Sequence, residues 1–251
     1  MFEPHVLAAL AVLFFVCAFV QGVIGFAFAL LALPLMLALG LSLPQAVLTV
    51  TIGASVQMAW AAFAMRDSIP WRRLAPVCIV AMLTTPIGIW LLQFVSTQGT
   101  NIVRQVIGGI ILLVVTAWWT IRPKRREKLG WGWDLLAGVI SGVLGGLASV
   151  AGTSLIVWTH AHKWTNQEYR VAPIATMFPR SLLQIVLMLA MMPGEALGPA
   201  VPSALLLVPG TILGAILGVH YGHRLSVPLL RVLVSLALVI MGVSSLLGPL
   251  L

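Results

Sequence analysis

Apolar runs long enough to cross a lipid bilayer recur from one end of the chain to the other. A membrane-spanning helix needs about 20 predominantly apolar residues, and a backbone inside a bilayer must satisfy its own hydrogen bonds, which helices do. Charged residues make up only 8% of the chain, far fewer than a soluble domain carries. We therefore predict an all-α polytopic membrane protein with about eight full spans plus half-helices.

One short glycine-containing stretch occurs twice, at Gln21–Phe26 and again at Ser141–Gly146, 120 residues later. The glycines of the two copies are Gly22, Gly25, Gly142, Gly145 and Gly146. Paired, glycine-interrupted apolar segments in corresponding halves of a chain point to a transporter's binding site. We predict that each copy breaks the first segment of its half, with the first break at residues 21–25. The alternative is that the glycines only allow tight helix packing.

The charge pattern divides the chain into a first transmembrane repeat at residues 1–121, a basic linker at 122–133 and a second transmembrane repeat at 134–251. Basic loops remain on the cytoplasmic side, which places the linker inside. Five segments per half, counting each broken segment as two arms, also bring the loop at 66–73 and Lys163 to that side. Five is an odd number, so we predict inverted repeats. Re-entrant hairpins and full crossings both remain open for the broken segments.

Arg180 lies in the middle of a predicted span, within Met177–Ser181. An Arg at the centre of an isolated helix costs at least about 2.5 kcal/mol, and the neighbouring turns contain no acidic residue. Because Arg binds oxyanions through two hydrogen bonds, we predict that it contacts an anion. The alternatives are neutralisation of Glu168 or bonds to carbonyls freed by Pro179. At an offset of 123 residues, Gln57 matches Arg180.

Polar side chains inside the spans supply further candidates for the site. Gln21 and Ser141 rank first because each immediately precedes a glycine stretch. Such side chains more often bond the backbone of neighbouring turns or helices than a ligand. His160 is a candidate proton carrier, although a loop role is the simpler interpretation. The lesser candidates are Thr49, Thr51, Ser55, Thr84, Thr85, Thr153, Ser154, Ser181 and Gln184.

Several function classes are excluded by what the sequence lacks. It contains no nucleophile elbow, no zinc-protease motif and no phosphate-binding loop, so we predict no enzyme, no catalytic residue and no cofactor. Cys17 and Cys78 lie within apolar runs and have no metal-ligand spacing, so we predict no metal site. The net charge of +8 is carried by short loops between apolar runs, which argues against a nucleic-acid partner.

These features together resemble the TauE/SafE family of sulfite exporters, also called TSUP membrane transporters. The resemblance covers essentially the whole chain. It rests on the first glycine stretch with Pro34 shortly after it, on the second copy, on the basic linker, and on Pro209–Gly218 followed by Leu229–Arg231. Many members carry three consecutive glycines, where this chain has Phe26–Phe28 and Gly146–Ala148 instead.

The resemblance implies a carrier of small sulfur-containing anions, such as sulfite, thiosulfate or sulfonates like sulfoacetate, in the bacterial inner membrane. We expect alternating access, with import and export both open and with H⁺ or Na⁺ as candidate coupling ions. The partners are then the anion and the lipid bilayer, and a homodimer is compatible with the sequence. The alternatives are a channel-like anion pore and a non-transporting membrane scaffold.

Overall fold

The computed structural model describes residues 2–24, 27–121, 130–222 and 227–247. Within these ranges eight helices are long and apolar enough to cross a membrane, which confirms the predicted all-α polytopic membrane protein. The elements are α1 (Pro4–Ile24), α2 (Phe28–Ala38), α3 (Leu43–Ala64), the 3₁₀ turn η1 (Arg66–Ser68), α4 (Trp71–Ser96), α5 (Thr100–Thr120), α6 (Trp131–Ala148), α7 (Gly152–Ala161), α8 (Asn166–Met191), α9 (Gly194–Leu197), α10 (Ala200–Tyr221) and α11 (Val227–Leu247).

Helices α3 and α8 begin with the same capping device, 123 residues apart. Ser42 accepts a hydrogen bond from the backbone N–H of Gln45, whose side chain accepts one from the N–H of Ser42. Thr165 and Glu168 form the equivalent reciprocal pair. Such a capping box satisfies two of the backbone donors that a helix start leaves unpaired. The shared offset supports the predicted correspondence of α3 with α8.

The helix breaks lie a few residues beyond the predicted positions. Helix α1 continues to Ile24 and α6 continues to Ala148, so the prediction that the glycine stretches themselves interrupt the helices is wrong for the described glycines. Gly25 lies outside the described residues. The chain instead turns near Ala27, with a φ of 103°, and Ser149, with a φ of 57°, the two non-glycine residues of the described ranges with positive φ.

The backbone of another helix packs directly on the glycines of α1 and α6. A Cβ atom added to Gly22 would lie 2.8 Å from the carbonyl oxygen of Ala215 and 3.0 Å from the Cα of Gly218 on α10. One added to Gly146 would lie 2.8 Å from the Cα of Gly88 on α4. Gly142 likewise faces the backbone of α4. Small residues at such interfaces let helices approach closely, so helix packing is the observed role of these three glycines.

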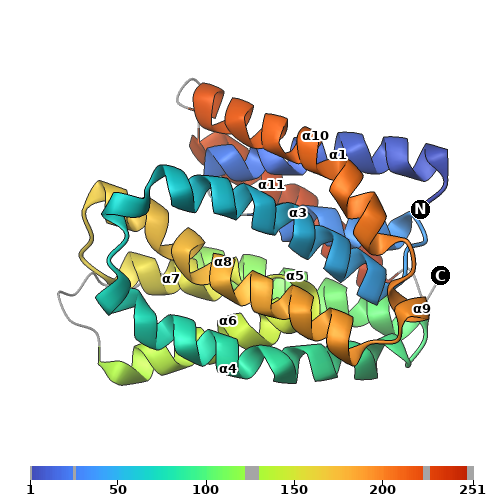
Figure 1. The fold of residues 1–251 in the computed structure, drawn as a ribbon, viewed down its shortest axis with the longest axis horizontal. Helices are drawn as coiled ribbons and strands as arrows, with labels where there is room; N and C mark the ends of the chain where they lie inside the picture. The colour runs from blue at the N-terminus through green and yellow to red at the C-terminus, as the bar shows by residue number, and fades with distance from the viewer. Residues whose placement is uncertain (1, 25–26, 122–129, 223–226, 248–251) are drawn as a thin grey trace.

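The two halves of the chain exchange equivalent contacts. Helix α1 packs along α10 while α4 packs along α6, α3 meets α10 while α8 meets α4, and α5 pairs with α11. In Figure 1, α1 and α10 lie side by side at the top of the bundle and α4 and α6 lie at the bottom. A two-fold relation between the halves would produce this pattern. In these contacts Gly22 takes the place of Gly146, so the register is 124 residues rather than 120, a slip of one helical turn.

The two ends of the bundle carry different loops. At one end, Ser68 donates a hydrogen bond to Gln167 at 2.9 Å, and the guanidinium of Arg73 lies over the ring of Trp164. The two loops predicted to share the cytoplasmic side are thus in contact; we call this the basic end. Of the predicted linker at 122–133, residues 122–129 lie outside the described residues, and its last three residues, 131–133, already belong to α6, which begins at Trp131. The short helix α9 lies at the opposite end (Figure 1).

Candidate functional site

The two short helices, α2 and α7, both start at one small internal cavity. Each has about half the length of a full span, with 11 and 10 residues. This central cavity has a volume of about 30 Å³, and its wall includes the first residues of both helices. Helix N-termini carry partial positive charge from unpaired backbone N–H groups, so the cavity lies between two positive helix ends. Its polar and N-terminal lining residues are Gln21, Ala27, Phe28, Ser149, Gly152 and Thr153.

Gln21 occupies the α1–α2 break. Its side-chain Oε1 accepts a hydrogen bond from the backbone N–H of Phe28 at 3.2 Å, and its exposed fraction is 8%. The ring of Phe28 packs edge-on against Phe14, with 5.1 Å between the ring centroids. The amide of Gln21 therefore caps α2 from the preceding helix, and an apolar contact fixes the cap.

Ser149 occupies the α6–α7 break. Its hydroxyl shares a short hydrogen bond with the hydroxyl of Thr51 on α3 and accepts one at 3.4 Å from the side-chain amide of Gln184 on α8. The same amide also donates to the carbonyl of Gly146 at 3.4 Å. Ala151, the N-cap residue of α7, contributes no side-chain hydrogen bond, so this helix start has no counterpart of the Gln21 cap among the described contacts.

Arg180 lies behind this hydroxyl network, fully inside the bundle. Its exposed fraction is 2%, and it donates from one terminal nitrogen to Oε1 of Gln184 at 2.7 Å. Its Nε has no hydrogen-bond partner among the described residues, and no described carboxylate pairs with it. A Cβ atom added to Gly145 would lie 2.5 Å from the guanidinium, so Gly145 provides the space that Arg180 occupies.

Two other predicted site residues, Gln57 and Ser141, are buried and make few hydrogen bonds. Gln57 is buried on α3, where its amide nitrogen donates weakly to the carbonyl of Ala18 at 3.5 Å and its Oε1 has no partner among the described atoms. Ser141 is buried two turns before Ser149 on α6, and its hydroxyl lacks a described partner too. A buried polar atom without a partner costs about 1–3 kcal/mol, and of these two residues Gln57 lines a described cavity.

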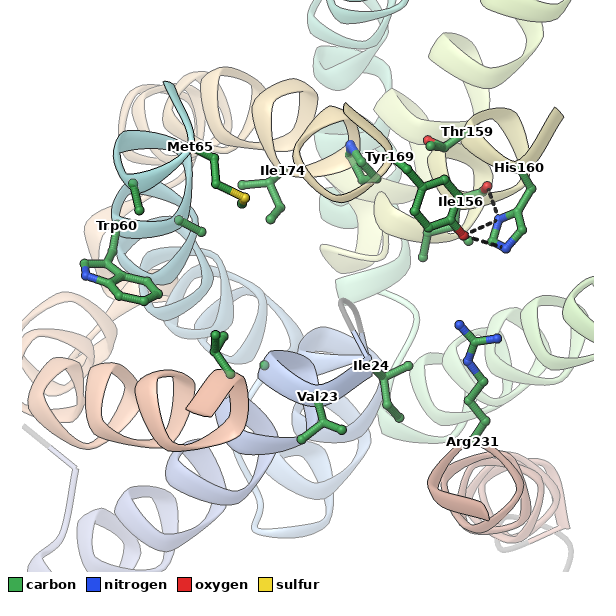
Figure 2. Close-up of a pocket in the computed structure, with 15 residues that line it drawn as sticks. Val23, Ile24, Trp60, Met65, Ile156, Thr159, His160, Tyr169, Ile174 and Arg231 are labelled. Carbon is green, nitrogen blue, oxygen red and sulfur yellow. Dashed lines mark hydrogen bonds between the residues drawn. The ribbon is translucent and has the colours of Figure 1, made fainter. Parts of the chain in front are cut away.

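Three neighbouring cavities with shared walls lie between the basic end of the bundle and the helix breaks. A large one of about 350 Å³, here called the vestibule, is drawn in Figure 2 and is bordered by Met65, His160 and Tyr169. It shares Gly22, Trp60, Ala61, Ile174 and Val219 with a connecting cavity of about 60 Å³. The connecting cavity in turn shares Gln21 and Met58 with the central cavity. Gln21 thus stands between the central cavity and the route to the basic end.

The sequence identified most of these residues but not Ser149. Gln184 and Thr51 were lesser candidates, and the structure brings both to the hydroxyl of Ser149. A serine at the end of an apolar run carries no signal of its own, since only its φ of 57° places it at a turn. The one available signal is its position three residues after Gly146.

The wider network holds the two central helices together. The hydroxyl of Ser55 on α3 donates to that of Ser181 on α8 at 2.8 Å, next to the Thr51–Ser149 contact. No group of three or more His, Cys, Asp or Glu side chains that could hold a metal ion occurs within the described ranges. The site is therefore built from hydroxyl, amide and guanidinium groups, which are hydrogen-bond donors suited to an oxyanion.

Comparison with known proteins assigns the chain to a family of transporters. The sequence matches the family described as sulfite exporter TauE/SafE over residues 9–245 of 251. The comparisons with curated proteins and with solved structures gave no match. The family match covers almost the whole helical bundle, including both breaks and most or all of each long helix. This multi-pass membrane protein therefore belongs to the TauE/SafE sulfite exporter family, whose members are transporters and not enzymes.

Proposed function

We propose that the chain is a secondary transporter of small sulfur oxyanions, such as sulfite, thiosulfate or sulfonates, in the bacterial inner membrane. The observation that carries the proposal is the convergence of two half-helix N-termini on one cavity beside a buried Arg. Discontinuous helices whose N-termini face anionic groups at the midplane recur in secondary transporters. The family membership supports sulfite as the first anion to test.

Arg180 supplies the charge in this proposal. A buried guanidinium without a carboxylate is costly, and a bound anion removes that cost. The hydrogen bond from Arg180 to Gln184, and that from Gln184 to Ser149, link the guanidinium to the wall of the central cavity. The remaining polar partners in this proposal are Gln21, Gln57 and Ser141. Among the described glycines, Gly145 makes room for Arg180, while Gly22, Gly142 and Gly146 let the surrounding helices pack closely.

Alternating access follows from the proposed inverted repeats, residues 1–121 and 134–251. In the described conformation the vestibule leads inward from the basic end, while the central cavity has room for only one or two water molecules. An oxyanion is larger, so binding must widen this cavity. We propose that the two halves rock against each other along the glycine-lined α1–α10 and α4–α6 contacts, and that H⁺ or Na⁺ is the coupling ion.

Uptake of radiolabelled thiosulfate into proteoliposomes tests this function. A carrier gives saturable flux that internal unlabelled thiosulfate accelerates by exchange, whereas a pore gives flux that rises linearly and shows no exchange. The Arg180→Lys variant keeps a charge but loses the planar fork, so we expect it to fold and to transport about tenfold more slowly. Equal rates for both proteins, or no flux with any sulfur oxyanion, would contradict the proposal.

A further inference from the structure

We infer that the vestibule contains a second oxyanion-binding subsite, formed by Arg231, His160 and Tyr169, which takes up its anion together with a proton. This inference rests on the proposed transport function and adds an entry site at the basic end. All three side chains line the vestibule. Figure 2 shows the guanidinium of Arg231 directed from α11 into the vestibule, on the side of the His160–Tyr169 pair and away from Trp60.

The charge of this cluster is positive and uncompensated among the described groups. The vestibule lining contains Arg231 and His160 but no carboxylate. Four described carboxylates interact with residues that do not line the vestibule: Glu3 with His5, Asp67 with Arg66, Asp134 with Trp158 and Glu168 with Thr165. A concave, one-signed lining raises the local concentration of the opposite ion. The vestibule is therefore suited to capture an anion before it reaches the connecting cavity.

The tautomer of neutral His160 follows from its two neighbours. Its Nδ1 lies 2.7 Å from the backbone carbonyl of Ile156, which only accepts, so Nδ1 carries the hydrogen. The hydroxyl of Tyr169 then donates to Nε2 at 2.7 Å. In this state the pair presents no polar hydrogen to the vestibule. A proton added at Nε2 reverses the bond: His160 donates to the Tyr169 oxygen, and the hydroxyl hydrogen turns toward the anion.

Several elements around His160 contribute charged or titratable groups. Tyr169 from α8 and Arg231 from α11 line the vestibule with it. Of the other groups, His162 stacks on Trp158, Asp134 of α6 is bonded to Trp158, and Glu168 is bonded to Thr165. Lys163 lies in the loop after α7, and Arg104 lies at the far end of α5. Protonation of His160 and binding of an anion beside Arg231 therefore favour each other, because each supplies the charge that the other lacks.

Equilibrium binding of radiolabelled thiosulfate to the purified full-length protein in detergent tests the subsite. Thiosulfate keeps its charge at about pH 6 and at about pH 8, on either side of the range in which imidazoles change charge. We expect wild type to bind about tenfold more tightly at the lower pH, and His160→Gln to lose that difference. Arg231→Gln should weaken binding about tenfold at both pH values, and Tyr169→Phe should weaken it mainly at the lower one.

Two matched controls separate the subsite from general effects. His162→Gln removes a histidine two residues away whose ring packs on Trp158 with 4.4 Å between centroids, and Arg104→Gln removes an Arg from the start of α5. Both should bind like wild type. The inference is overturned if His160→Gln keeps the pH dependence, or if Arg231→Gln binds like wild type, even where transport persists. Wild type that neither binds nor transports thiosulfate would overturn the proposed function as well.

Discussion

The two helix breaks face the same central cavity, but only one of them has a side chain that caps the helix starting there. At the α1–α2 break, the neutral amide of Gln21 caps the N-terminus of α2. At the α6–α7 break, the N-cap residue leaves α7 without a side-chain cap, and Arg180 lies behind a network of hydroxyls and amides. The first break is closed by its own side chain. The second has free capacity for a ligand, so we propose that the anion is held mainly by the second half.

The difference between the two breaks also appears in the sizes of the residues that correspond between the two halves. In the 124-residue register set by the contacts of α1 and α6, Gln21 corresponds to Gly145. In the 123-residue register set by the capping boxes of α3 and α8, Gln57 corresponds to Arg180. One half combines two medium side chains, while the other combines the smallest side chain with one of the longest. The missing side chain at Gly145 provides the volume for the guanidinium. A charge can thus be buried on one side of the cavity without disturbing the packing of the other.

The largest expected effect comes from making the second break resemble the first. Gly145→Gln alone pushes a side chain into the guanidinium of Arg180, which should cost about 1–3 kcal/mol of stability and abolish thiosulfate uptake. Adding Arg180→Gln frees that space, so the double variant should recover part of the lost melting temperature but no transport. A non-additivity of about 0.5–3 kcal/mol is typical for residues in contact.

Gly132→Gln is the control for that series, since a Cβ atom at this α6 position meets nothing within 4 Å. It should melt and transport like wild type. If Gly145→Gln behaved like Gly132→Gln in thermal melts and uptake assays, Gly145 would not be the residue that makes room for Arg180.

A smaller effect is expected from removing the cap of the first break. Gln21→Leu leaves the buried N–H of Phe28 without an acceptor, which should cost about 1–3 kcal/mol and lower the melting temperature. Gln21→Glu keeps the acceptor, so stability should fall less, but its carboxylate would repel an anion in the central cavity. Thiosulfate affinity should therefore fall more for Glu than for Leu, and the reverse order would show that Gln21 serves only as a cap.

The smallest effects are expected where the chain turns. Ala27→Gly removes a side chain from a backbone with positive φ, and should raise stability by about 1 kcal/mol. Ser149→Gly gains the same relief but loses the hydroxyl that bonds Thr51 and Gln184, at about 0.5–1.5 kcal/mol per hydrogen bond. The melting temperature should rise for the first variant only. Equal rises in both would show that the hydroxyl network contributes little.

Apolar run length predicted the helices well because span length is set by bilayer thickness. The burial of Arg180 was also predictable, since it lies far from both ends of its helix. The positions of the helix breaks could not be predicted, because the sequence of a glycine stretch is the same whether the backbone bends there or another helix packs on it. Only the contacts of Gly22 with α10 and of Gly146 with α4 distinguish these cases.

The predicted offset of 120 residues between the two glycine stretches was wrong for a related reason. A slip of one turn keeps every residue on the same face of a helix, so the glycine match at 120 residues and the contact match at 124 both satisfy the sequence pattern. The vestibule pair of His160 and Tyr169 was equally hidden, because its members come from different helices and meet only through the turn between α7 and α8.

The most direct test of the role proposed for Arg180 is the thiosulfate-induced rise in melting temperature of purified wild type and of Arg180→Gln. A ligand at about 100 times its Kd stabilises the folded state by about 2.7 kcal/mol. We expect a clear rise for wild type that chloride does not reproduce, most of that rise in Gln57→Leu, and little or none in Arg180→Gln. An undiminished rise in Arg180→Gln would contradict anion binding at the second break.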